Sequence, residues 1–191
     1  MVNYPNGKKA AVSLEGLNDN HARRGMSLED DINTSNSFYL SVDKAVIYKK
    51  PTPIQIVHVD YKQRSKARID EAYFRKPSTT DYNGVYRGLP VDFEAKETHS
   101  NSSFPTSLVQ AHQLDHLERV LRQNAVAFVL VRFSTKGMTF YVEADKMINV
   151  IRKEKKKSLP LQWFLDNAHL VPSSLRNPVD YLTVVDQLYK E

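Results

Sequence analysis

The sequence contains no cysteine and no long hydrophobic run. The absence of cysteine excludes thiolate nucleophiles, cysteine zinc sites and disulfide bonds, and it is typical of proteins in a reducing cytoplasm. No segment approaches the roughly 20 apolar residues that a membrane-spanning helix needs, and the first residues lack the apolar core of a secretion signal. Walker loops, dinucleotide-binding glycine patterns, serine nucleophile elbows and internal repeats are also absent. We therefore expect a cytoplasmic protein that uses none of these chemistries.

Basic residues outnumber acidic ones. The 191 residues suffice for one domain whose core needs no disulfide or structural metal. The formal net charge is +5, and the stretch from Asp43 to Lys76 alone holds nine basic and four acidic residues. This excess favours a polyanionic partner, such as nucleic acid, the ribosome or an acidic membrane surface. A second basic run, from Arg152 to Lys157, has the pattern of a solvated helix end.

Residues 1–25 are polar and basic, with few apolar positions. We expect this segment to be flexible, or to become ordered only on DNA. Ser27 followed by Asp30 indicates the start of a helix that continues through Tyr39. Glu29, in its first turn, either stabilises the helix dipole or supports a metal site from this neighbouring helix.

Two extended segments, Ile54 to Tyr61 and Ala67 to Arg75, flank the basic stretch Lys62 to Lys66. Their alternation predicts a long β-hairpin with a basic tip. The hairpin either only improves solubility or forms a projecting arm that binds DNA. In the second case basic side chains contact phosphates and two aromatic rings stack or wedge near bases. The candidate DNA-binding residues are Arg64, Lys66, Arg68, Tyr73 and Phe74.

The stretch from Ser78 to Thr98 combines a turn signal with an alternating strand. Asn83-Gly84 and Gly88 predict turns that bring Asp81 back towards the strand. Within the strand, Asp92, Glu94 and Lys96 share one face, while the apolar residues between them face the other way. On spacing alone this pattern favours a solvated surface strand, although it also fits a site for metal-assisted phosphodiester cleavage.

Regular elements are also predicted in the second half of the chain. A helix extends to about Asn124 and carries Gln113 beside its apolar stripe. His112, Asp115 and His116 on this helix give only a weak zinc pattern. Ala125 to Phe133 predicts a strand covered on both faces, paired with 138–142. Helices are expected at 145–151, 160–167 and 179–189, with packing anchors at Trp163, Phe164 and Leu165.

Several of these strings, in this order, resemble the RecU family, whose members have a PD-(D/E)XK nuclease-like fold. The matching strings are Arg24-Gly25-Met26 with Glu29, KKPTPIQIV (49–57), EAYF (71–74), STTDYNGVY (78–86) and DFEAKET (92–98). The resemblance implies an α/β, restriction-endonuclease-like fold in which helices flank a mixed central sheet. It implies one nuclease domain over 26–191, with the basic hairpin, or stalk, inserted at about 51–76.

The same resemblance assigns roles to individual residues. Thr79, Asp81, Glu94 and Gln113 match the family's magnesium-site positions, and Mn²⁺ is expected to substitute for Mg²⁺. Lys96 matches the lysine that stabilises the transition state, so that Lys96, Asp81 and Glu94 are the expected catalytic residues. The broad superfamily pattern has proline before the aspartate, whereas this sequence has Thr80, and the RecU pattern also has threonine there.

The function implied by the resemblance is a magnesium-dependent endonuclease that resolves Holliday junctions by paired symmetric nicks during recombination and DNA repair. The expected partners are four-way DNA junctions, a second copy of the chain in a homodimer and other recombination proteins, with no membrane partner. The expected location is the bacterial cytoplasm, at the nucleoid when bound to DNA. Two alternatives stay open: a non-catalytic junction-binding or strand-annealing module, and a related nuclease that acts on duplex DNA.

Overall fold

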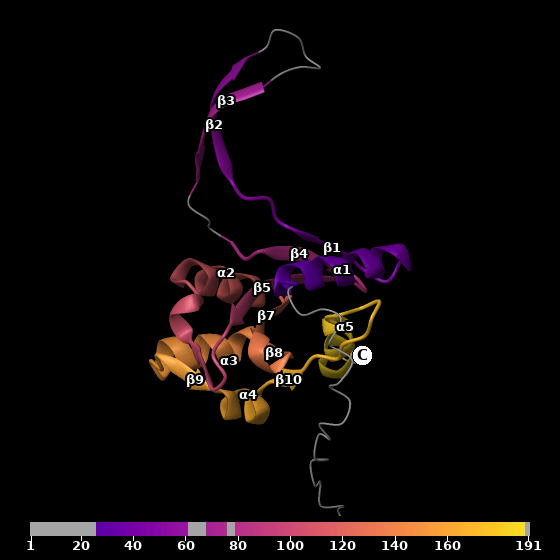
Figure 1. The fold of residues 1–191 in the computed structure, drawn as a ribbon, viewed down its shortest axis with the longest axis vertical. Coiled ribbons are helices and arrows are strands. Elements are labelled where there is room, and N and C mark those ends of the chain that lie inside the picture. Colours follow the sequence, from indigo (N-terminus) through magenta and orange to yellow (C-terminus); the bar gives the residue numbers. More distant parts are fainter. Residues whose placement is uncertain (1–25, 61–67, 76–78, 190–191) are drawn as a thin grey trace, which may run out of the picture.

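A six-stranded mixed sheet forms the centre of the molecule (Figure 1). The computed structural model describes residues 26–60, 68–75 and 79–189. The strands follow the order β1-β4-β5-β7-β8-β10; β5 and β7 run parallel, and the other neighbours run antiparallel. Their bounds are β1 Val46–Lys49, β4 Tyr82–Tyr86, β5 Leu89–Thr98, β7 Val126–Phe133, β8 Met138–Glu143 and β10 His169–Leu170. Because β5 and β7 lie inside the sheet, both of their faces must be covered.

Helices cover both faces of this sheet. The helices are α1 Leu28–Ser41, α2 Ala111–Leu121, α3 Ala144–Ile148, α4 Leu161–Asn167 and α5 Tyr181–Leu188. α1 and α5 belong to the hydrophobic core on the Phe93 face, whereas α2, α3 and α4 belong to the core on the Val129 face. Among the described residues, no helix has the length and apolar character to cross a membrane. The predicted architecture, a mixed sheet flanked by helices, is confirmed.

Short elements complete the body on the α2 side. The strands β6 and β9 pair antiparallel as a small separate sheet. The bounds of the short elements are β6 Ser103–Pro105, β9 Ser158–Pro160, the 3-10 turns η3 Thr106–Leu108 and η4 Ser134–Lys136, and the π-helical turn η5 Asn149–Lys153. The π-helical turn extends α3 directly, so the helix predicted at 145–151 exists but does not stay α-helical throughout.

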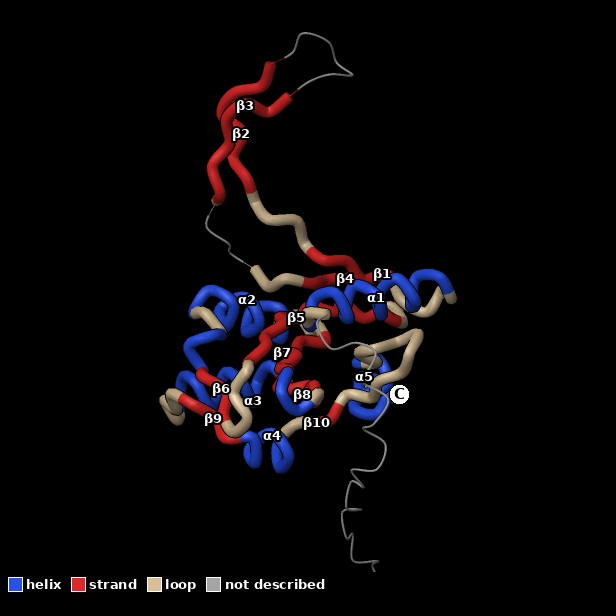
Figure 2. The backbone as a smooth tube through the Cα atoms, viewed as in Figure 1, coloured by secondary structure: helices blue, strands red, loops and turns tan. Residues whose placement is uncertain are grey.

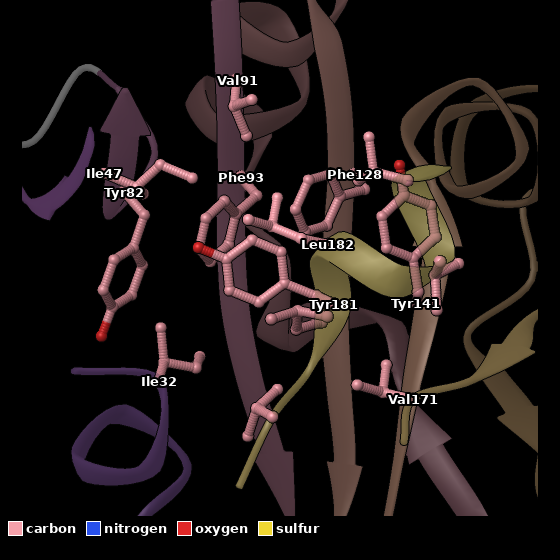
Figure 3. Close-up of a cluster of buried hydrophobic side chains, with 14 of the residues drawn as sticks. Ile32, Ile47, Tyr82, Val91, Phe93, Phe128, Tyr141, Val171, Tyr181 and Leu182 are labelled. Atoms are coloured by element: carbon pink, nitrogen blue, oxygen red, sulfur yellow. The ribbon is translucent and has the colours of Figure 1, made fainter. Parts of the chain in front are cut away.

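An aromatic row crosses the centre of the sheet (Figure 3). Tyr82, Phe93, Phe128 and Tyr141 come from four adjacent strands, and successive ring centroids lie 4.8, 4.6 and 4.2 Å apart. All four side chains are fully buried. Such cross-strand aromatic pairs stabilise a sheet in one register. Because Phe93 precedes Glu94 in β5, this row fixes the strand that carries the predicted site residues.

A two-stranded arm projects from the body beside β1 and β4 (Figure 2). The predicted hairpin is confirmed for its described strands, β2 Ile54–Asp60 and β3 Arg68–Phe74, which pair antiparallel. Tyr73 and Phe74 are 61% and 83% exposed, and they pair with residues 55 and 54 at the end of the arm nearest the body. The predicted basic tip with Arg64 and Lys66, and the N-terminal segment 1–25, lie outside the described residues.

Of the two predicted turns, the one at Gly88 is confirmed and the one at Asn83-Gly84 is wrong. Asn83 and Gly84 lie inside β4, and the chain reverses at Arg87 and Gly88, which have φ values of 49° and 75°. Gly84 instead permits a close approach of the neighbouring strand, since a Cβ atom there would lie 2.1 Å from the carbonyl oxygen of Val46. An Asn-Gly pair indicates a turn because glycine tolerates unusual backbone geometry, but glycine also serves where two backbones meet.

The packing prediction for α4 is correct for Phe164 and Trp163 and wrong for Leu165. Phe164 is fully buried, Trp163 is partly buried and packs against the same core, and Leu165 is 49% exposed. Three consecutive residues on a helix point in three directions about 100° apart, so a short surface helix cannot direct all of them into the core.

Candidate functional site

Three charged residues of β5 face the α2 side of the sheet. Asp92, Glu94 and Lys96 alternate with Val91, Phe93 and Ala95, which belong to the core under α1. The predicted shared face is therefore confirmed. The solvated-strand alternative is wrong, because Asp92 is 8% exposed and Glu94 is 0% exposed. Helix α2 packs against this face of β5 and excludes water from it.

Asp81 and Glu94 meet because β4 pairs with β5. Tyr82 lies opposite Phe93 in the register, which places Asp81, just before β4, beside Glu94. The main-chain N–H of Asp81 donates to Glu94 Oε2 at 3.2 Å. Lys96 Nζ lies 2.7 Å from the other oxygen, Glu94 Oε1. The structure thus brings together the three residues predicted to be catalytic.

The electrostatics of Glu94 favour a cation at this site. Burial and, next, a side-chain hydrogen bond with Asp81 raise the pKa of Glu94, and the positive charge of Lys96 opposes both effects, so that the pKa is about 8. A single ammonium group therefore does not fully compensate two adjacent carboxyl groups in a dry site. A divalent cation between them would supply the missing charge.

The remaining predicted ligands lie on segments that adjoin this pair. Thr79 is half-buried, and its hydroxyl donates to the carbonyl oxygen of Thr80 at 3.2 Å. Gln113 is buried in the first turn of α2, where its Oε1 accepts from the main-chain N–H of Gln110 at 2.8 Å. Each side chain keeps a lone pair beyond these contacts. Their role as metal ligands stays a prediction.

The chemistry of the donor set fits a hard divalent cation. Asp81 and Glu94 offer carboxylate oxygens, and Thr79 and Gln113 offer neutral oxygens. Mg²⁺ prefers oxygen ligands, needs only one or two carboxylates and retains several water molecules. Within the described parts of the chain, no group of three or more His, Cys, Asp or Glu residues could hold a metal ion. The zinc alternative on α2 is therefore wrong, and its Asp115 instead forms an ion pair with Arg152.

No partner was predicted for Asp92, and the structure places three side chains around its carboxylate. The Thr80 hydroxyl donates to Oδ1, while Lys50 Nζ and His116 Nε2 each lie 3.1 Å from Oδ2. Two observations pointed towards this cluster: Asp92 shares the face of Glu94, and Thr80 precedes Asp81. The contributions of Lys50 and His116 had no sequence signal, because they depend on how β1 and α2 pack against β5.

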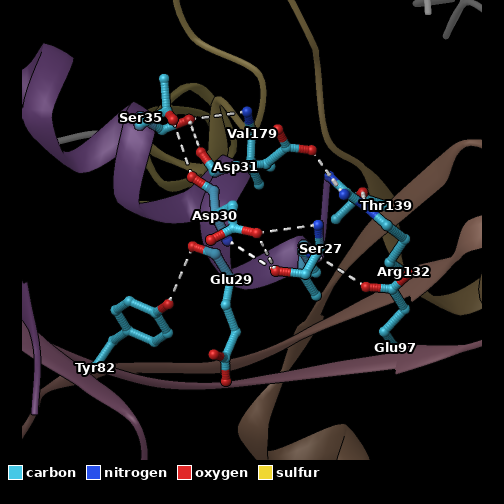
Figure 4. Close-up of polar contacts among 12 residues, drawn as sticks. Ser27, Glu29, Asp30, Asp31, Ser35, Tyr82, Glu97, Arg132, Thr139 and Val179 are labelled. Atoms are coloured by element: carbon cyan, nitrogen blue, oxygen red, sulfur yellow. Dashed lines mark hydrogen bonds and ion pairs between the residues drawn. The ribbon is translucent and has the colours of Figure 1, made fainter. Parts of the chain in front are cut away.

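Helix α1 is attached to the opposite face of β5 and β7 (Figure 4). The predicted capping box between Ser27 and Asp30 is confirmed. The main-chain N–H of Leu28 donates to Glu97 Oε2 at 2.9 Å, and Arg132 lies 2.7 Å from Asp31. Glu29 forms an ion pair with Lys49 of β1, which favours a structural role for this residue over metal support.

Comparison with known proteins identifies the family. The family model described as RecU: Recombination protein U matches residues 23–187. The chain is 45% identical to the Holliday junction resolvase RecU of Oceanobacillus iheyensis, covering 98% of this chain and 100% of that protein. It is 44% identical to the proteins of the same name from Listeria welshimeri and Geobacillus kaustophilus, with 98% of each chain covered.

A structural similarity was also found, to the Holliday junction resolvase Hjc of Archaeoglobus fulgidus. Its TM-score is 0.42 at 9% identity, over 70% of this chain and 91% of that one. The predicted resemblance to RecU thus holds over nearly the whole chain, both in the family model and in full-length relatives. The chain belongs to the RecU family.

Proposed function

We propose that this chain is an endonuclease that resolves Holliday junctions during homologous recombination and DNA repair. The observation that carries the proposal is the contact of the fully buried Glu94 with both Asp81 and Lys96, which are partly buried. The full-length relatives named Holliday junction resolvase RecU supply the substrate class. A protein that only bound DNA would gain nothing from a buried carboxyl group beside a second one, because its desolvation is unfavourable and one lysine compensates the pair only in part.

Phosphodiester hydrolysis at this site uses Mg²⁺, with Mn²⁺ as a substitute, held by Thr79, Asp81, Glu94 and Gln113. The bound ion would activate a water molecule and stabilise negative charge on the phosphate. Glu94 holds Lys96 Nζ at 2.7 Å and thereby fixes the direction of its positive charge. Lys96 then orients the nucleophilic water or offsets the charge that develops on the phosphate.

The arm provides the contacts that distinguish a junction from linear DNA. Arg64, Lys66 and Arg68 contact phosphates, and Tyr73 and Phe74 offer exposed rings for stacking. The charge is concentrated in the connection 61–67, which has three basic residues and no acidic one, whereas the flanking strands also carry Asp60, Asp70 and Glu71. Because both rings lie near the body, they would meet DNA closer to the cleavage site than Arg68, which pairs with residue 60 at the other end of the described strands.

Resolution of a four-way junction requires two nicks at symmetric positions. Two identical active sites related by a twofold axis match the approximate symmetry of the junction, so we assign a homodimer. The nuclease domain would comprise residues 26–191 with the arm inserted at about 51–76. Action on junctions places the protein at the nucleoid of the bacterial cytoplasm, where other recombination proteins are its further partners.

A substrate comparison tests this function. A four-way junction with each strand labelled in turn, and a linear duplex of the same sequence, are incubated with the protein with and without Mg²⁺. We expect Mg²⁺-dependent nicks in one pair of opposed strands of the junction, at symmetric positions. Equal cutting of the duplex would favour the duplex-nuclease alternative, and tight junction binding without any nick would favour the non-catalytic module.

A further inference from the structure

Asp92 is a buried carboxylate in the site to which the cleavage chemistry assigns no role. It shares the face of β5 with Glu94 and Lys96 and is 8% exposed. Its Oδ1 accepts a hydrogen bond from the Thr80 hydroxyl, and its Oδ2 accepts one from Lys50 Nζ at 3.1 Å; His116 Nε2 also lies 3.1 Å from Oδ2, without the geometry of a hydrogen bond. Because both oxygens already have partners, Asp92 is poorly available as a metal ligand.

Asp92 and two of its partners lie beside proposed metal ligands. Thr80 lies between Thr79 and Asp81 in the chain, and Asp92 itself lies two residues before Glu94 on one face of β5. His116 follows Gln113 by three residues on α2, a spacing that places both on one side of the helix. The carboxylate therefore joins all three segments that carry the four proposed ligands.

Lys50 connects the segment 80–81 with the base of the arm through hydrogen bonds. Its main-chain N–H donates to the carbonyl oxygen of Asp81 at 2.7 Å, and its Nζ donates to the Thr80 hydroxyl at 3.0 Å. Lys50 is the residue directly before the loop that leads into β2. The arm thus leaves the body at a residue whose main chain and side chain both hold the segment 80–81 in place.

We propose that Asp92 is a positioning residue for the metal site, acting through Thr80, Lys50 and His116. It keeps Asp81 and Gln113 at fixed places relative to Glu94, so that the oxygen atoms are arranged before the metal binds. Hydrogen-bonded partners of this kind, one step removed from the metal, typically change metal affinity by about 10- to 100-fold when they are lost. This inference rests on the proposed function, because it concerns the metal site assigned there.

A purely structural role predicts a different response. Lys50 and Asp92 form a largely buried ion pair, so removing either charge leaves the other uncompensated and lowers stability. Removing both charges restores the balance. If Asp92 mattered only for charge balance, a double variant would therefore recover stability and metal affinity together.

The test measures Mn²⁺ affinity, by electron paramagnetic resonance titration, and the urea midpoint of wild type, Asp92→Asn, Lys50→Met and the double variant. Asp115→Asn, which removes a carboxylate of α2 paired with Arg152 outside the cluster, is the matched control. We expect Asp92→Asn to weaken Mn²⁺ binding about 10-fold. The double variant should regain its urea midpoint but not its Mn²⁺ affinity, and Asp115→Asn should bind as wild type does.

Recovery of wild-type Mn²⁺ affinity in the double variant would overturn the proposal, as would unchanged affinity in Asp92→Asn. If Asp92→Asn does not fold, Thr80→Val replaces it, because valine has nearly the shape of threonine and removes one hydrogen bond of the cluster. Wild-type affinity in folded Thr80→Val would then contradict the proposal. Failure of the metal site itself is distinguishable, since wild type would then bind no Mn²⁺, or would bind it as Asp81→Asn does.

Discussion

Asp81 and Glu94 are separated by thirteen positions, yet the main-chain N–H of Asp81 donates to Glu94 Oε2 at 3.2 Å. The antiparallel register of β4 and β5 produces this contact, because Tyr82 pairs with Phe93. The rings of these two residues stack on the other face of the strands, with their centroids 4.8 Å apart, and this contact stabilises the register. The hydrophobic core and the candidate metal site are therefore two faces of one strand pair.

Lys96 should contribute to cleavage and not to metal binding. Lys96→Met keeps the length of the side chain and removes its charge, so we expect junction nicking to slow by about 100-fold or more. Mn²⁺ affinity should be retained or increased, because a cation next to Glu94 is lost. Single-turnover nicking and Mn²⁺ titration measure the two effects. Lys146→Met, which breaks a surface ion pair with Glu143, is the control. If Lys96→Met loses Mn²⁺ binding and Lys146→Met does not, the assigned role of Lys96 is wrong.

The metal-free protein should lose stability as Glu94 ionises. The pKa of Glu94 is raised from 4.5 to about 8, so its protonated form stabilises the fold fully below pH 4.5, and this contribution is lost as pH rises towards 8. Glu94→Gln cannot ionise. In EDTA, the free energy of unfolding of wild type should therefore fall relative to that of the variant across this interval.

Urea denaturation at a series of pH values measures this difference. Glu118→Gln, which removes a carboxylate paired with Arg152 away from the site, should give a difference from wild type that changes little over the same interval. If the difference in the free energy of unfolding between wild type and Glu94→Gln does not change with pH, ionisation of this carboxyl group does not destabilise the fold, and the prediction is wrong.

Gly84 should be required for the close approach of β1 and β4. In Gly84→Ala the added Cβ would lie 2.1 Å from Val46 O and 2.5 Å from Ile47 Cα, so the strands must separate. We expect a loss of about 3 kcal/mol in the free energy of unfolding. Gly88→Ala is the matched control: no atom lies within 4 Å of its added Cβ, and only its positive φ is unfavourable, by roughly 1 kcal/mol. If chemical denaturation shows equal losses in the free energy of unfolding for the two variants, the close approach of the strands at Gly84 does not determine stability.

The arm should determine the salt dependence of junction binding. Replacing Arg64, Lys66 and Arg68 by glutamine removes three phosphate contacts, so the slope of log affinity against log salt should become shallower by up to about 2.7. Fluorescence anisotropy at several salt concentrations measures it. Glutamine at Lys153, Lys155 and Lys157, which are exposed in the second basic run, makes the same change in net charge. If the slope of log affinity against log salt becomes equally shallow in this second triple variant, the net charge of the protein and not the arm explains the effect.

Local patterns were sufficient to predict the strand that carries the site. Alternation placed Glu94 and Lys96 on one face, and basic residues between two extended segments indicated the arm. Both features depend on residues close together in the sequence, for which periodicity is informative. The wrong turn at Asn83-Gly84 shows the limit, because a glycine that admits a neighbouring backbone has the same letter as a glycine that turns the chain.

The burial of the charged face was not predictable from local pattern. Glu94 is covered because α2 crosses between the parallel strands β5 and β7 and packs on that face. The Asp92 cluster also depends on packing between elements. Lys50 precedes Asp92 in the sequence and His116 follows it, and the fold brings both to this carboxylate. Such contacts follow from the three-dimensional arrangement of elements, and a single sequence carries no periodic signal for them.

A comparison of wild type with Asp81→Asn, on a labelled four-way junction in Mg²⁺, tests whether Asp81 and Glu94 form the metal site of a junction-resolving nuclease. Asparagine keeps the size of the side chain and the main-chain contact with Glu94, and it removes one of the two carboxylates. We expect Asp81→Asn to bind the junction as tightly as wild type does and to make no nicks. Mg²⁺-dependent nicking by purified Asp81→Asn at the wild-type rate would contradict this expectation.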